Sequence, residues 1–207
     1  MPIPKIIHIV WIGDEKKRPD ECIETWRLKN PDYEVKVWGN DTLSSHSWHN
    51  GKHMQAMSRF ELNGVADMMR YEILYNEGGI AVDADSKCLR GLEDWLLEPE
   101  AFAAWENELL RPGLIACGAI AGSPKNKFWG TCIKACMDKP TVTDERAWKT
   151  VGPRHLTEVY RKTKYPLTIY PSHFFYKTHH TGFVYETTGP CFADQFWGST
   201  NGYENVN

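Results

Sequence analysis

Residues 63–85, Asn-Gly-Val-Ala-Asp-Met-Met-Arg-Tyr-Glu-Ile-Leu-Tyr-Asn-Glu-Gly-Gly-Ile-Ala-Val-Asp-Ala-Asp, decide the fold class. Residues 63–77 predict a helix, because apolar side chains supply bulk along it and the pair Gly78-Gly79 is a strong stop signal. Residues 80–85 follow at once and predict a short strand. A helix that turns directly into a strand is typical of a domain in which the two elements alternate.

The N-terminal part of the chain predicts a β-α-β unit. Residues 5–12 form a near-continuous apolar run that ends at Gly13, as in a strand buried on both faces of a parallel sheet. Residues 18–28 predict a helix, and residues 33–38 alternate as a second strand does. Units of this kind join parallel strands through a right-handed crossover.

Weaker patterns predict the remaining elements. Residues 41–60 are polar, and we expect a loop and the start of a helix there. Further helices are expected near residues 92–97, 128–137 and 153–162, and further strands near residues 114–121 and 167–170. The sequence contains no internal repeat or linker, so residues 1–207 are predicted to form a single α/β domain with a mainly parallel sheet flanked by helices.

The composition excludes several classes of protein. Lys and Arg number 24 against 27 Asp and Glu, and this net charge of −3 offers no electrostatic basis for binding nucleic acid. An aromatic content of 13% argues against disorder. The six cysteines are scattered and contain no CxxC pair, which favours buried free thiols over a zinc site or a disulfide scaffold.

The sequence predicts neither a secretion signal nor a transmembrane segment. Its first residues, Met-Pro-Ile-Pro-Lys, lack the basic-then-apolar order of a signal peptide. The apolar run at residues 6–12 is too short to cross a bilayer. We therefore expect a cytoplasmic protein with no anchor of its own.

The triplet Asp83-Ala84-Asp85 carries the chemistry. On a strand, side chains two residues apart point to the same face, so the two carboxylates are expected to lie together. They would repel each other unless a cation neutralised them, and oxygen ligands suit Mg²⁺ or Mn²⁺. The carboxyl end of a strand is also where open α/β sheets bind ligands.

Asp67 and Arg70 lie three residues apart on the preceding helix and share one of its faces. Two interpretations are open for this pair. One is an ion pair on the surface, which would stabilise the fold by less than ~1 kcal/mol. The other is a polar clamp that holds ligand hydroxyl groups beside the metal, and the position of the pair just before Asp83 and Asp85 favours it.

Residues 65–85 resemble the signature of the DXD-containing sugar transferases of glycosyltransferase family 32. That family includes fungal α-mannosyltransferases and bacterial capsular polysaccharide transferases, and the glucosylating clostridial toxins carry a related form. Residues 3–13 are similar to the first strand of the same group. Weaker likenesses at residues 121–124, 151–153, 170–172 and 196–199 extend the resemblance to about residue 200.

This resemblance implies a GT-A fold, a Rossmann-like sheet that binds a nucleotide-sugar through a divalent metal. Asp83 and Asp85 match its metal and diphosphate motif, with Asp85 also counted as catalytic. Asp67 and Arg70 match positions that hold the hydroxyl groups of the donor sugar.

The resemblance also implies a nucleotide site at the end of the first strand, formed by Val10 and Trp11. Trp11 matches the residue that stacks on uracil in the related toxins. A flat indole suits the face of a base, since stacking is worth ~1–3 kcal/mol per base.

The sequence departs from the family pattern near the C-terminus. Family members often carry His-His before the Trp-Gly-Ser segment, whereas residues 193–200 here read Ala-Asp-Gln-Phe-Trp-Gly-Ser-Thr. Asp194 is the predicted third metal ligand, with Gln195 as its alternative, although diphosphate and water could also complete the shell. The upstream histidines are weaker candidates: His173, His179 and His180. Trp197 is expected in a tail that closes over the donor, but Thr200 replaces the final Trp of the pattern.

The implied activity is transfer of a sugar from a nucleotide-sugar to an acceptor hydroxyl, with retention and with Mn²⁺ or Mg²⁺, in cell-surface or other glycan synthesis. Trp11 favours a UDP-sugar, although mannosyl members of the family use GDP-mannose. The acceptor would be a glycan, a lipid-linked molecule or a protein. The short chain without a membrane stem favours a bacterial or viral enzyme.

Two other functions remain open from the sequence. They are hydrolysis of the nucleotide-sugar and a catalytically inactive nucleotide-sugar-binding module. If the reaction inverted configuration, it would need a base, and Glu106 and Asp144 qualify by residue type alone.

Overall fold

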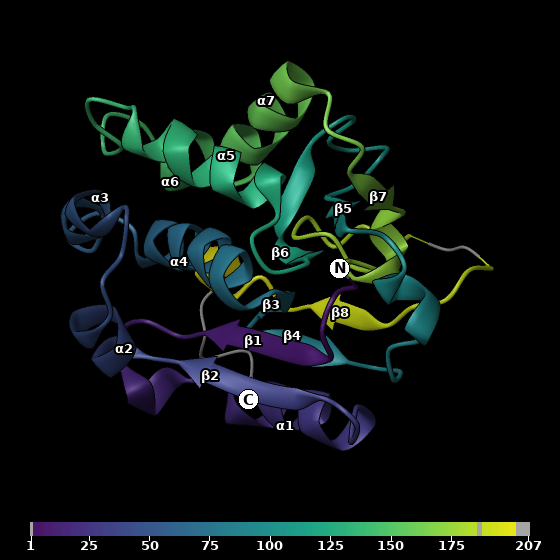
Figure 1. The fold of residues 1–207 in the computed structure, drawn as a ribbon. Helices are drawn as coiled ribbons and strands as arrows, with labels where there is room; N and C mark the ends of the chain where they lie inside the picture. The colour runs from purple at the N-terminus through teal and green to yellow at the C-terminus, as the bar shows by residue number, and fades with distance from the viewer. Residues whose placement is uncertain (1, 186–187, 202–207) are drawn as a thin grey trace.

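The β-α-β unit expected at the N-terminus is present in the structure, a computed structural model that describes residues 2–185 and 188–201 (Figure 1). Strand β1 (Ile6–Val10) leads through α1 (Asp20–Lys29) to β2 (Glu34–Trp38), and the two strands pair in parallel. The remaining residues of the expected domain, 1, 186–187 and 202–207, lie outside the described part.

A six-stranded sheet organises the molecule, in the order β2-β1-β3-β6-β5-β7. Its other strands are β3 (Gly79–Asp83), β5 (Ala101–Trp105), β6 (Ile115–Gly122) and β7 (Thr168–Tyr170). β1 pairs in parallel with β2 and β3, and β5 pairs in parallel with β7. β6 runs antiparallel to both of its neighbours, so the sheet is mixed but mainly parallel, as predicted.

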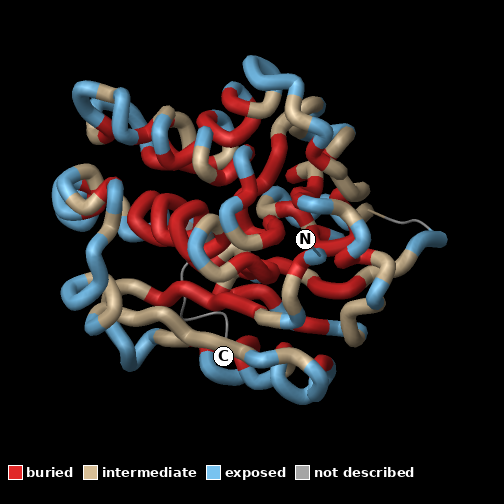
Figure 2. Tube along the Cα trace, viewed as in Figure 1, coloured by how far each residue is buried: buried red, intermediate tan, exposed pale blue. Residues whose placement is uncertain are grey.

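Two layers cover the sheet (Figure 1). On one face lie α3 (Gly51–Met57), α4 (Leu62–Glu77), α5 (Lys127–Met137), α6 (Ala147–Thr150) and α7 (Pro153–Thr163), which pack around one hydrophobic cluster. On the other face lie α1 and the aromatic residues 174–176 and Phe192, which belong to a second cluster. Figure 2 shows the buried residues concentrated in α4 and the central strands. The α/β class with helices flanking the sheet is therefore confirmed.

The alternation of side chains between the two clusters reverses within β6. Ile115 and Cys117 face the helical cluster, whereas Ala119 and Ala121 face the aromatic cluster. The pairing of β5 with β6 shows a shift of register over the same stretch. Such bulges bend a strand and are common beside functional sites. This one lies opposite the end of β3.

The structure differs from expectation in several short elements. β5 was missed because its residues are mostly alanine, which has low strand propensity. The expected helix at 92–97 is a 3-10 turn, Asp94–Leu97, and residues 40–57 form α2 (Asn40–Ser45) and α3. A small second sheet of β4 (Ser86–Cys88) and β8 (Ala193–Gln195) was also missed, as was α8 (Gly198–Asn201). Two further 3-10 turns are Glu15–Lys17 and Ser172–Phe174.

The turn between α4 and β3 depends on its two glycines. Gly78 has φ +69° and Gly79 has φ +102°, conformations that other residues rarely adopt. A Cβ on Gly79 would lie 2.6 Å from the carbonyl oxygen of Ile6. Only glycine therefore lets α4 lead into β3 this close to β1.

Two further sequence expectations concern the state of the cysteines and the presence of membrane-spanning helices. All six cysteines are free thiols within the part of the chain described, as predicted. Across residues 2–185 and 188–201, none of the helices has the length and apolar character needed to cross a membrane.

Candidate active site

A cavity of about 670 Å³ opens at the carboxyl ends of β1 and β3. Its walls include six residues predicted from the sequence: Val10, Trp11, Asp67, Arg70, Asp83 and Asp85. They come from β1 and the residue after it, from α4, and from the end of β3 and the turn that follows it. The parallel arrangement of β1 and β3 places their carboxyl ends side by side, which brings these distant segments together.

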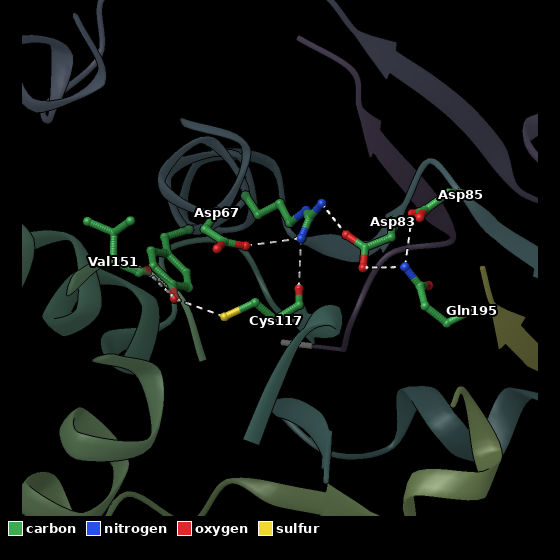
Figure 3. Close-up of polar contacts among 8 residues, drawn as sticks. Asp67, Asp83, Asp85, Cys117, Val151 and Gln195 are labelled. Carbon is green, nitrogen blue, oxygen red and sulfur yellow. Dashed lines mark hydrogen bonds and ion pairs between the residues drawn. The ribbon is translucent and has the colours of Figure 1, made fainter. Parts of the chain in front are cut away.

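Arg70 is the centre of an ionic network with Asp67 and Asp83, both of which are labelled in Figure 3. Its Nη1 donates hydrogen bonds to Asp67 Oδ1 at 3.2 Å and to the carbonyl oxygen of Cys117 at 3.2 Å. Its Nη2 forms an ion pair with Asp83. Asp67 and Arg70 are only 7% and 5% exposed, so the interpretation of this pair as a surface ion pair is wrong.

The helix that carries Asp67 and Arg70 is itself held firmly. Tyr71, the next residue of α4, donates a hydrogen bond to the carbonyl oxygen of Val151 at 2.9 Å, and its hydroxyl lies 3.2 Å from Cys117 Sγ. These contacts join α4 to β6 and to the segment between α6 and α7. Arg70 therefore has little freedom to leave the network.

The network holds more negative than positive charge. Burial raises the pKa of Asp67 to about 7, although Arg70 opposes the shift and Asp83 adds to it. Burial also raises the pKa of Asp85 to about 6, with help from Asp83 and against the backbone N–H of Gly198. Burial works to lower the pKa of Arg70, but Asp83 and Asp67 outweigh it, so Arg70 stays charged. A single guanidinium among these carboxylates leaves the site suited to a further cation.

Asp83 and Asp85 meet at one side chain. Gln195 Nε2 donates to Asp83 Oδ2 at 3.0 Å and to Asp85 Oδ1 at 2.9 Å (Figure 3). The backbone N–H of Gly198 donates to Asp85 Oδ2 at 2.5 Å. β3 ends at Asp83, and Asp85 lies in the turn that follows, so the two carboxylates come together without both being on the strand.

The structure places the predicted ligand Asp194 away from this pair. Its carboxylate accepts hydrogen bonds from the backbone N–H and the hydroxyl of Thr178, both at 2.8 Å. Neighbouring side chains of a strand point to opposite faces, so on β8 it is Gln195 that faces the aspartates. The alternative ligand, Gln195, is thus the one that the fold brings to the site.

The residues present fit a divalent metal. Asp83, Asp85 and the amide of Gln195 form an oxygen donor set, which suits Mg²⁺ or Mn²⁺. Gln195 Oε1 is buried and has no hydrogen-bond partner among the described residues. A half-turn of this amide would present Oε1 between the two carboxylates.

Val10 and Trp11 form the wall at the end of β1. Trp11 is 8% exposed, and its Nε1 donates a hydrogen bond to the carbonyl oxygen of Asp14 at 3.1 Å. This bond fixes the indole, whose exposed part lines the cavity. The stacking of a uracil on Trp11 stays a prediction.

Several lining residues carried no sequence signal of their own. Tyr176 lines the cavity, and its buried hydroxyl has no partner in the described part of the chain. A Cβ on Gly118 would lie 2.0 Å from Asp83 Oδ2, so the absence of a side chain at Gly118 makes room for that carboxylate. Of the two bases considered by residue type, Glu106 lines the cavity, whereas Asp144 is exposed on the loop before α6.

Comparison with known families supports the class of protein that the sequence resembles, the DXD-containing sugar transferases. Residues 16–102 match the family model described as "Glycosyltransferase sugar-binding region containing DXD motif". This region contains α4, β3 and the Asp83-Ala84-Asp85 triplet. The resemblance to DXD-containing sugar transferases predicted from the sequence is confirmed over this region of the chain.

The relatives found by sequence comparison are named as mannosyltransferases or glycosyltransferases. The chain is 31% identical over 138 residues to "Initiation-specific alpha-1,6-mannosyltransferase" of Candida albicans, covering 62% of this chain and 34% of that protein. It is 32% identical over 111 residues to "Inositol phosphoceramide mannosyltransferase 3" of Schizosaccharomyces pombe, covering 47% and 28%. An uncharacterized glycosyltransferase of Acanthamoeba polyphaga mimivirus is 30% identical over 100 residues, covering 45% and 40%. The chain thus spans well under half of these relatives' length.

Solved structures share the fold. The "PaToxG Glycosyltransferase" superposes with a TM-score of 0.65 at 19% identity, covering 78% of this chain and 70% of that one. The UDP-bound glycosyltransferase domain of the YGT toxin gives a TM-score of 0.61 at 10% identity, covering 81% and 79%. At these identities the likeness shows the fold alone, and the predicted GT-A fold is confirmed.

Proposed function

We propose that this chain transfers a sugar from a nucleotide-sugar to an acceptor hydroxyl, with a divalent metal held by Asp83 and Asp85. One observation carries this proposal: Arg70 pairs with Asp67 and Asp83, and Gln195 extends this largely buried network to Asp85 in the cavity wall. Such a network is costly to bury, because each charge loses its hydration. Its arrangement around a cavity rather than inside the core supports a role in binding.

Each side chain has a separate task in the proposed reaction. When bound, the metal supplies positive charge against the charge that grows on the leaving diphosphate. Arg70 and Asp67 hold the sugar in one orientation, which lowers the entropy cost of the reaction. A carboxyl with a pKa of about 7, as Asp67 has, can both accept and donate a hydrogen bond to a sugar hydroxyl near neutral pH.

The donor is proposed to be a UDP-sugar. Trp11 offers an indole at the end of β1, where the base of a nucleotide would lie, and Val10 lies beside it. The UDP-bound toxin domain with the same fold supports this choice. The mannosyltransferases among the relatives make GDP-mannose the main competing donor.

Retention of configuration is proposed because it needs no strong base, since the leaving phosphate can accept the proton of the acceptor. The acceptor would be a glycan, a lipid-linked molecule or a protein, within cell-surface or other glycan synthesis. Glu106 is the residue in the cavity wall that could serve as base if the reaction inverts instead.

The test is a panel of UDP-sugars and GDP-mannose incubated with the chain in Mn²⁺, in Mg²⁺ and in chelator, with and without acceptors. We expect nucleotide release that requires the metal and rises with the right acceptor. Asp85→Asn should lose at least ~100-fold in rate, as when a group that stabilises transition-state charge is removed. Asp144→Asn, an exposed aspartate outside the cavity wall, is the matched control and should keep full activity.

Three outcomes would contradict the proposal. Undiminished turnover by Asp85→Asn would remove the role given to Asp85. Release of free sugar at the same rate with every acceptor would indicate a hydrolase. Metal-dependent binding of a nucleotide-sugar without any turnover, across the whole acceptor panel, would indicate a binding module.

A further inference from the structure

A second cluster of metal-binding side chains lies in the same cavity, apart from the aspartates. Glu106 follows β5, and His179 and His180 lie between β7 and β8, in the yellow-green segment of Figure 1. One donor atom from each of these residues lies within 4.8 Å of the other two. Neither Asp83 nor Asp85 belongs to this group. Glu106 and His180 line the cavity, so the cluster faces its interior.

A tight hairpin holds the two histidines. The backbone N–H of Gly182 donates to the carbonyl oxygen of His179 at 2.8 Å, and that of His179 donates to Phe183 O at 2.8 Å. Thr178 and Val184 form a β-bridge just outside this turn. Gly182 has φ +82°, which completes the reversal of the chain. The rings of His179 and His180 are thereby held with centroids 4.0 Å apart.

His179 points an unused nitrogen at Glu106. Its Nδ1 lies 2.9 Å from Thr181 Oγ1, which fixes the ring. Its Nε2 lacks a hydrogen-bond partner within the described residues, although the side chain is only 2% exposed. A buried nitrogen without a partner is costly, and it requires an explanation.

The distance between His179 and Glu106 fits a shared metal. His179 Nε2 lies 3.6 Å from Glu106 Oε1, too far for a good hydrogen bond. Two ligand atoms that each lie ~2.0–2.1 Å from one tetrahedral metal are roughly 3.4 Å apart. A small inward adjustment would therefore place both atoms on the same ion.

We propose that Glu106, His179 and His180 bind one divalent transition metal, and that Zn²⁺ is the ion they suit best. Two imidazoles and a carboxylate are a donor set of catalytic zinc sites, which keep a fourth position open. The nitrogen-rich set prefers a different ion from the all-oxygen set at Asp83 and Asp85. The open position faces the cavity and would take a hydroxyl or phosphate oxygen.

Arg111 is the group that competes with this metal. Its Nε lies 3.3 Å from the same Glu106 Oε1, although it makes no hydrogen bond with any group in the part of the chain described. The guanidinium also lies over the ring of Trp148, 5.2 Å from the centroid. Because Arg111 is half-exposed, it can turn toward solvent when a cation enters. Arg111→Gln is therefore expected to tighten metal binding several-fold.

The experiment measures metal binding directly, without turnover, so its result does not depend on the proposed sugar transfer. Metal-stripped protein is titrated with Co²⁺, whose visible absorption reports a tetrahedral nitrogen–oxygen site, and Zn²⁺ is then added in competition. We expect one Co²⁺ per chain with an intense visible band, displaced by one Zn²⁺. Asp85→Asn should keep this band, because that variant alters only the aspartate site.

Thr181→Val tests the geometry with little risk to the fold, since Thr181 is exposed and the two side chains have the same shape. Loss of a group that orients a metal-binding histidine weakens metal affinity by ~10–100-fold. The matched control is Thr131→Val, an exposed threonine of α5, which should bind as the unaltered protein does. Glu106→Gln and His180→Ala remove ligands and should abolish the band.

Three results would overturn the proposal. One is a band of unchanged strength in both Glu106→Gln and His180→Ala. Another is a band that disappears in Asp85→Asn, which would place the ion at the aspartates. The third is a spectrum with the near-ultraviolet charge-transfer features of cysteine ligands.

Discussion

The two halves of the cavity are built in different ways. One half comes from β1, α4 and β3, and within α4 every residue from Gly64 to Leu74 is buried. The other half comes from residues 172–185 and 188–201, which contribute a three-residue strand, a hairpin and a four-residue helix. Aromatic contacts hold this second half, among them those of Phe174, Phe175 and Phe192.

The first half is positioned by the helix and strands that form it. The second half is positioned partly by its contacts with the first half. Gln195 donates hydrogen bonds to Asp83 and Asp85, and the backbone N–H of Gly198 donates to Asp85. These bonds occupy carboxylate oxygens that a metal would use. A ligand that engages the aspartates therefore changes the contacts of residues 193–200. We therefore expect the first half to act as a fixed support and the second to change when a ligand binds. Four experiments test this contrast.

The largest effect is expected from Arg70→Met. This change leaves the buried Asp67 and the partly exposed Asp83 without their cation, and breaking such a pair costs ~3–5 kcal/mol in the free energy of unfolding. Urea denaturation measures the loss. The control is Lys134→Met, which breaks the exposed pair with Asp138 and should cost under ~1 kcal/mol. Equal losses in the two variants would show that the first half is not a fixed support.

The second experiment compares the loss of stability when one glycine in each half is replaced by alanine. Gly79→Ala would strain a residue at φ +102° and bring a Cβ 2.6 Å from Ile6 O, so we expect a loss of about 2–3 kcal/mol. Gly182→Ala in the hairpin carries only the strain of φ +82°, since none of the described atoms lies within 4 Å of its added Cβ. Its loss should be about 1 kcal/mol. A larger loss at Gly182 in thermal or chemical unfolding would reverse the contrast.

Variants of Asp194 and Gln195 distinguish the contacts that stabilise the second half from those that bind the metal. Asp194→Ala removes two bonds to Thr178 and should lower stability by about 1–2 kcal/mol. It should leave the Mn²⁺ affinity unchanged when that affinity is followed by electron paramagnetic resonance. Gln195→Ala should weaken Mn²⁺ binding with little loss of stability. Weaker Mn²⁺ binding in Asp194→Ala alone would restore Asp194 as the metal ligand.

The smallest effect is expected from pH, through His8 in the first half. Its Nε2 lies 2.7 Å from the carbonyl oxygen of Gly78, and its Nδ1 accepts a hydrogen bond from Trp38 at 3.1 Å. Burial lowers the pKa of His8 more than the Gly78 carbonyl raises it. As the pH falls below ~6.5, the unfolded chain takes up the proton first, so the stability that neutral His8 contributes is complete above that pH and declines below it.

His8→Gln isolates this contribution. Between about pH 7.5 and 5.5, the unaltered protein should lose more stability than His8→Gln in urea denaturation. His46→Gln, at an exposed histidine, should follow the unaltered protein. A parallel loss in all three proteins would show that His8 does not hold the turn at Gly78.

The first half was predictable because its information is local. A helix, two glycines and a DXD triplet follow one another within residues 63–85, so spacing alone indicated the helix, the turn and the shared side of the two aspartates. The buried depth of Asp67 and Arg70 was not predictable, since it depends on the layer formed by α5, α6 and α7. Nor was the end of β3 at Asp83 predictable, because the turn at Asp85 follows from the pairing of the next strand, β4, with β8 in a separate sheet.

The second half was much less predictable because its contacts join residues far apart in the chain. Gln195 was considered, but choosing it over Asp194 needed the register of β8 against β4. Glu106 was weighed only by residue type, and its approach to His179 spans more than seventy residues. No local pattern encodes a meeting of that kind. β5 was missed for a simpler reason, since a run of alanines has no strand signature.

Gly118 has a practical consequence. A single methyl group there would occupy the place of Asp83 Oδ2. Gly118→Ala would thus give a protein with the same net charge and every ionisable side chain intact, yet with its carboxylate displaced. Such a protein would separate the position of this carboxylate from the total charge of the cavity, so a change in its metal binding would report position alone.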